Sequence, residues 1–219
     1  MANEIVWKKT IKHLLFEEFS MEEKDDLILK LEKYYLDSIL KNYKIWANFD
    51  YLNSIIFPAL TLSQDKHIKN SSVIFLALFF KYSLRDQPEL YFLNKEYCEE
   101  FFNNNFTYNI QKYKKAVLFL LTSTFYIPND MVSEKDFDYF QDILCYCQPL
   151  KYSEDIFIFI TDEYKIKIYY SAKKHMLTKD DSKEILEKFI NNNLTFKTKI
   201  FTDMHNAKIN KYMEMYKKL

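Results

Sequence analysis

The sequence predicts a single all-α domain, and three observations lead to this fold class. The chain has 219 residues, of which 48% are hydrophobic, so it can bury a core without disulfides or metals. It contains no glycine, which excludes two-residue β-hairpins of the Asn-Gly type. Apolar residues at helical spacing recur along the chain, with capping residues before them. We therefore expect one helical bundle over residues 1–219.

The expected helices follow in chain order. A helix over residues 4–19 and a second one opened by the capping box of Ser20 and Glu23 form an N-terminal pair within residues 1–40. Ser133 is the expected cap of the helix that starts at residue 134. The remaining helices are predicted over residues 48–56, 71–84, 88–102, 108–125, 134–147, 181–191 and 203–218. The apolar run 116–127 is expected to be a buried helix, because crossing a bilayer takes ~20 residues.

Residues 156–170 admit two interpretations. Two alternating runs on either side of residues 161–163 predict a β-hairpin when periodicity is considered alone. The helical alternative places Ile156, Ile160, Tyr164 and Lys167 on one face. Both remain open at the level of periodicity.

Composition excludes several classes of function. Without glycine there is no dinucleotide-binding fingerprint, no phosphate-binding Walker A loop and no Gly-x-Ser-x-Gly nucleophile elbow. Basic and acidic residues number 31 each, so the net charge of zero indicates neither nucleic acid nor an anionic membrane as a partner. The first residues show no export signal, and we expect a cytoplasmic protein.

The residues that could carry chemistry do not form a complete site in the sequence. No two histidines have the spacing of a metal pair on a helix, and the cysteines are odd in number, which suits reduced thiols. These residues are His13, His67, His175, His205, Cys98, Cys145 and Cys147. The sequence therefore predicts neither a metal site nor a nucleophile.

Several segments, taken in order, resemble the predicted metal-dependent HD-superfamily phosphohydrolases. They are Trp7, residues 46–52 (WANFDYL), residues 77–85 (ALFFKYSLR), Glu89, Thr124 with Ile127, residues 160–164 (ITDEY) and residues 207–210 (AKIN). The last two match the family best and favour a helix over residues 156–170. The resemblance implies a helical bundle of the HD-domain type.

The resemblance also implies that the family's metal centre is lost. At the positions of the metal ligands this chain has Ala47, Tyr51, Lys81 and Tyr82. Alanine has no lone pair to offer, protonated tyrosine is a poor ligand, and a lysine ammonium repels a cation. Asp138 or Asp142 would be the remaining carboxylate, and no cofactor is expected.

A candidate ligand pocket follows from these substitutions. Its residues are Tyr51, Lys81, Tyr82, Arg85, Glu89 and Asp142. The charge of Lys81 would replace that of the metal and balance Asp142 or Glu89, while Lys81 with Arg85 could also bind a phosphate.

We expect a catalytically inactive HD-like protein with a binding or regulatory role, whose partner is a protein or a nucleotide or phosphate ligand. One alternative is a phosphohydrolase with a displaced divalent-metal site, and another is a metal-free nucleotide-binding or phosphate-binding protein.

Overall fold

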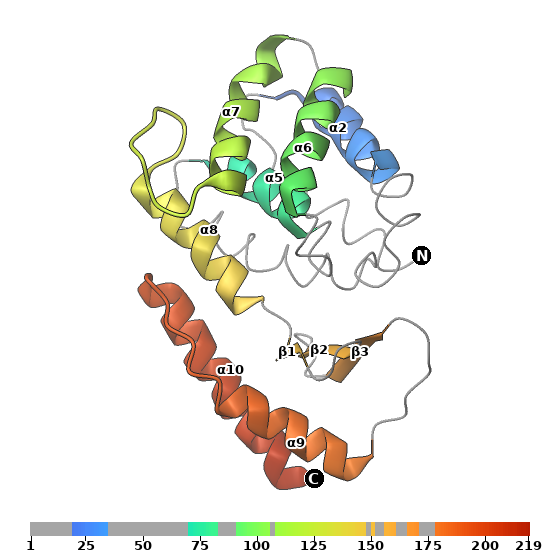
Figure 1. The fold of residues 1–219 in the computed structure, drawn as a ribbon, viewed down its shortest axis with the longest axis vertical. Helices are drawn as coiled ribbons and strands as arrows, with labels where there is room; N and C mark the ends of the chain where they lie inside the picture. The colour runs from blue at the N-terminus through green and yellow to red at the C-terminus, as the bar shows by residue number, and fades with distance from the viewer. Residues whose placement is uncertain are drawn as a thin grey trace. The chain divides into compact units, whose positions relative to one another are not determined.

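A computed structural model describes residues 19–34, 70–82, 91–105, 108–147, 150–151, 156–160, 166–170 and 178–219 (Figure 1). The chain forms two compact units, Met1–Phe140 and Gln141–Leu219, which we call unit 1 and unit 2. Helices make up most of the described residues, which confirms the helical class in its main part. The single domain and the packing of residues 1–40 stay predictions.

Unit 1 is built around a helix without a polar face. Its helices are α2 (Met21–Tyr34), α5 (Ser71–Tyr82), α6 (Tyr91–Asn105), α7 (Tyr108–Thr122) and the first part of α8 (Glu134–Tyr146). In α5 every residue from 72 to 80 is buried. A helix that is apolar all round must be covered on all sides, and α5 packs against both α6 and α7 (Figure 1).

Aromatic rings form the centre of unit 1. Phe80 of α5 is fully buried and lies 5.9 Å from the ring of Tyr34, 5.5 Å from Phe101 and 6.5 Å from Phe102, measured between ring centroids. Tilted and edge-on pairs at these distances add to the stability that burial alone provides. Three helices, α2, α5 and α6, are thereby joined at one aromatic cluster.

Unit 2 contains a small antiparallel sheet and a helical hairpin. The strands β1 (Leu150–Lys151), β2 (Ile156–Ile160) and β3 (Ile166–Tyr170) lie in the order β1-β2-β3. Ile156 pairs with Tyr170, and Ile160 pairs with Ile166. The helices are the end of α8, α9 (Lys179–Ile190) and α10 (Lys199–Lys218).

The strands correct one prediction. The helix over residues 156–170, which the family resemblance favoured, is wrong, and the hairpin that the alternation predicts is present. Alternating isoleucines favour a pleated strand, and β2 and β3 are separated by more than the two residues of the Asn-Gly turn that this chain lacks.

Several helix boundaries also differ from the prediction. Helix α7 ends at Thr122, so the run 116–127 is not one buried helix, and Phe125 and Ile127 are 66% and 51% exposed. Helix α10 begins at Lys199 rather than at residue 203 because Thr198 is its cap. Helix α9 begins at Lys179 rather than at residue 181 because Thr178 is its cap. The helix start expected at residue 88 lies outside the described residues. The helices expected over residues 4–19 and 48–56 lie outside the described residues.

Two of the expected caps are present. Ser20 and Glu23 form a reciprocal capping box at the start of α2, and Ser133 accepts a hydrogen bond from the Asp136 amide at the start of α8. Within the described part of the chain, no helix is both long enough and apolar enough to cross a membrane.

Candidate functional site

The structure describes part of the predicted ligand pocket. Lys81 belongs to unit 1 and Asp142 to unit 2, and each is therefore considered within its own unit. Tyr82 is the last residue of α5, and its side chain lies outside the described part. Ala47, Tyr51, Arg85 and Glu89 also lie outside the described residues.

Asp142 on α8 holds the start of α10. It is 2% exposed, and one carboxylate oxygen accepts a hydrogen bond from the Lys197 amide at 2.9 Å. The other oxygen accepts from the Thr198 amide at 2.8 Å and from the Thr198 hydroxyl at 2.5 Å. Because Thr198 is the N-cap of α10, its amide has no acceptor within the helix, and the Asp142 carboxylate supplies one. Asp138, the other carboxylate considered, is half-buried on the same helix.

Aromatic side chains surround this start of α10. The ring of Phe201 lies 5.6 Å from Tyr146 and 6.2 Å from Phe196, and the Lys208 ammonium lies 4.2 Å above Tyr146. His205 lies 5.2 Å from Phe196. Partial burial lowers the pKa of His205, and the charge of Lys208 lowers it further. The positions of His205 and Lys208 are therefore explained by packing against aromatic rings of unit 2.

Lys81 occupies the end of another helix. Its side chain is half-buried, and its Nζ donates to the carbonyl oxygen of Leu121 at 3.4 Å, in the last turn of α7. The carbonyl end of a helix carries partial negative charge, which a lysine ammonium complements. The same end disfavours an anion, so this position suits a cation better than a phosphate.

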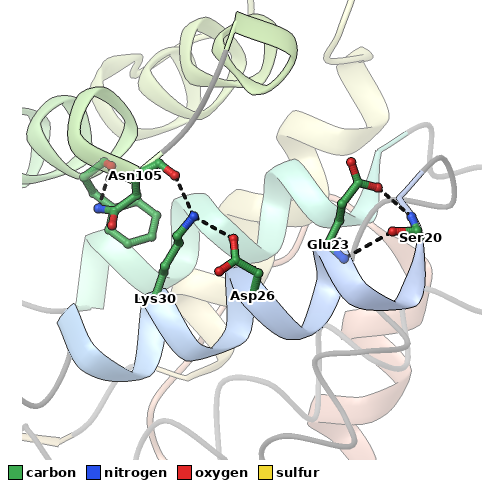
Figure 2. Close-up of polar contacts among 6 residues, drawn as sticks. Ser20, Glu23, Asp26, Lys30 and Asn105 are labelled. Carbon is green, nitrogen blue, oxygen red and sulfur yellow. Dashed lines mark hydrogen bonds and ion pairs between the residues drawn. The ribbon is translucent and has the colours of Figure 1, made fainter.

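A second lysine, which the sequence analysis did not single out, has the same role. Lys30 of α2 donates to the carbonyl oxygen of Asn105 at 2.9 Å and pairs with Asp26 at 2.6 Å (Figure 2). Asn105 is the last residue of α6 and also donates to the Phe101 carbonyl. Helices commonly end at glycine, and this chain has none. At the carbonyl ends of α6 and α7, lysine side chains from neighbouring helices donate hydrogen bonds to the terminal carbonyl groups instead.

A solvent-open pocket lies between α9 and α10 within unit 2, and the sequence analysis missed it. It has a volume of ≈ 320 Å³ and is lined by Glu187, Ile190, Asn191, Met213, Tyr216 and Lys217. The Tyr216 hydroxyl donates to Glu187 at 2.6 Å. This hydrogen bond raises the pKa of Tyr216, and the carboxylate charge acts in the same direction. Apolar residues at helical spacing in both segments were the available signal.

Among the described residues, no group of three or more histidine, cysteine or acidic side chains is arranged to hold a metal ion. Comparison of the chain with family models, with curated proteins and with solved structures finds no match.

Proposed function

We propose that this chain is a binding or regulatory protein that does not hydrolyse phosphate esters. One observation carries the proposal: Asp142 accepts three hydrogen bonds from Lys197 and Thr198. A cation on the same oxygens would face the positive ends of these donors. The geometry therefore supports a structural role for Asp142 better than a place in a reaction centre.

The descent from HD-superfamily phosphohydrolases stays part of this proposal as a prediction from sequence. The helices of unit 1 are compatible with it, whereas the β2–β3 hairpin removes one of the two segments that resembled the family best. The binding role does not depend on that descent.

The test combines metal analysis, activity and stability. We expect the purified protein to carry no stoichiometric Mn, Fe, Zn or Mg, and to hydrolyse neither nucleotides nor phosphomonoesters with these metals added. We expect Asp142→Asn to lower the free energy of unfolding by about 1.5–3 kcal/mol, because it removes hydrogen bonds to a charged acceptor.

Asp203→Asn is the matched control, since Asp203 lies on α10 with its side chain 59% exposed. We expect it to change stability by less than about 0.5 kcal/mol. Stoichiometric metal, together with turnover that Asp142→Asn abolishes without destabilising the fold, would overturn the proposal.

Phosphate binding at Lys81 is the weaker proposal, because this lysine lies at the carbonyl end of α7. Adding nucleotides or inorganic phosphate should leave the melting temperature unchanged. A rise in melting temperature that Lys81→Ala removes would establish the phosphate site instead.

A further inference from the structure

The pocket between α9 and α10 is lined by both apolar and charged side chains. We call the residues that line it, Glu187, Ile190, Asn191, Met213, Tyr216 and Lys217, the α9–α10 face. Met213 is 42% exposed, although most exposed positions of α10 carry polar residues. Helix α9 packs against the C-terminal part of α10 (Figure 1).

Few residues are fully buried beneath this face. Leu186 and Tyr212 are buried between the two helices, and the apolar side chains around them are covered only in part. These partly buried side chains are Phe189, Ile190, Ile209, Met215, Tyr216 and Leu219. Two helices bury one seam, whereas a four-helix bundle encloses apolar positions from all of its helices. The hairpin thus has apolar surface that further helices would cover.

The spacing of the lining residues suits packing against helices. Helix α9 contributes Glu187 and Ile190 together with its C-cap Asn191, and α10 contributes residues 213, 216 and 217, so each set has the spacing i, i+3 and i+4. Side chains at these positions form the ridges and holes into which the ridges of another helix pack. A volume of ≈ 320 Å³ accommodates apolar side chains from a facing helix.

Charge on the rim identifies the occupant. Glu187 and Lys217 have opposite signs and lie on different helices of the hairpin. A two-fold axis through the face can place Glu187 of each copy opposite Lys217 of its partner, so the surface is complementary to itself. A nucleic acid or an anionic membrane would need a surplus of basic residues, which this rim lacks. The whole chain carries no net charge and does not repel a copy of itself.

We propose that two copies of this chain associate through the α9–α10 face about a two-fold axis, so that their hairpins form a four-helix bundle. Met213 and Ile190 of each copy pack at the centre, and the Glu187–Lys217 pairs flank them. This dimer does not depend on the function proposed above.

The test is the molecular mass of the full chain in solution, measured by sedimentation or light scattering over a range of concentrations. We expect the mass to rise with concentration towards twice 26.7 kDa. Met213→Glu should raise the dimer dissociation constant about tenfold or more, because it places an unpaired charge at the centre of the interface. Met21→Glu is the matched control, since Met21 is 61% exposed on α2 of unit 1, and it should leave the dissociation constant unchanged.

Charge reversal provides a second test that does not depend on Met213. Glu187→Lys and Lys217→Glu should each weaken self-association, and an equimolar mixture of the two variants should restore it as a heterodimer with both pairs matched. Circular dichroism checks that each variant is folded. A monomeric wild type, a Met213→Glu variant that dimerises like the wild type, or a mixture that stays as weak as its components would overturn the proposal.

Discussion

Helix α5 of unit 1 and helix α10 of unit 2 show how differently the two units use their apolar residues. In α5 every residue from 72 to 80 is buried, whereas the 20-residue α10 buries only Phe201 and Tyr212. A helix covered on all sides contributes stability and offers no surface to a partner. A helix covered on one side retains a surface for binding. Among the described residues, unit 1 therefore contains most of the buried hydrophobic core, whereas α9 and α10 of unit 2 bury two residues each.

Thiol reactivity gives the largest expected difference between the units. Cys98 of unit 1 is fully buried, which also raises the pKa of its thiol, whereas Cys145 and Cys147 at the end of α8 are half-exposed. We expect two thiols to react quickly with an alkylating reagent, and Cys98 to react roughly a thousandfold more slowly, because unit 1 must open first. Peptide mass spectrometry distinguishes the three sites. Similar rates at all three would contradict the comparison.

Truncation of the aromatic cluster should destabilise unit 1 strongly. Phe80→Ala removes a fully buried ring, and we expect the free energy of unfolding to fall by about 3–5 kcal/mol in urea titrations. Cys98 should then react faster as well. Phe125→Ala is the control in the same unit, since this ring is 66% exposed, and it should change stability by no more than about 0.5 kcal/mol. Equal losses in both variants would show that burial is not the cause.

Two capping boxes allow the units to be compared at matched positions. Ser133 and Asp136 cap α8 in unit 1, and Thr178 and Asp181 cap α9 in unit 2. Replacement of either cap by alanine should cost about 1 kcal/mol of unfolding free energy. Ser133→Ala should be the more costly, because it removes the side-chain acceptor of the backbone amide of Asp136, a residue that is only 1% exposed. A larger loss for Thr178→Ala would contradict this order.

The pH dependence of unit 2 is the smallest expected effect. His205 has a pKa below its ordinary value of 6.5 in the folded protein, because it is partly buried and lies near Lys208. The unfolded chain therefore takes up the proton more readily. The contribution of neutral His205 to the free energy of unfolding is therefore fully present above pH 6.5. It is lost as the pH falls through the lower pKa of the folded protein. His205→Gln should flatten that part of the dependence in melts recorded across this range. An unchanged profile would exclude His205 as its origin.

The sequence predicted local structure well wherever neighbouring residues decide it. The capping boxes at Ser20 and Ser133 join residues three positions apart, so their pattern is visible without the fold. The alternation in residues 156–160 and 166–170 was equally local and correctly indicated strands. The error there came from giving a family resemblance precedence over periodicity.

The candidate site could not be predicted in the same way. The family resemblance placed Lys81 and Asp142 at a lost metal centre, and their charges then suggested a ligand pocket. Their partners lie 40 positions away in the case of Leu121 and 55 positions away in the case of Lys197. The exposure of Met213 likewise depends on which helices cover α10, and its helical spacing did not reveal this.

The sequence by itself thus determined the caps of α2 and α8, the alternation of β2 and β3, the absence of glycine-dependent motifs, and the apolar character of α5. Only the tertiary structure decided which charged side chain forms hydrogen bonds with which helix end, and which apolar residues remain on the surface. The physical reason is that capping and periodicity depend on residues within a few positions of each other. Pairing of a buried charge and coverage of an apolar face depend instead on segments brought together by packing.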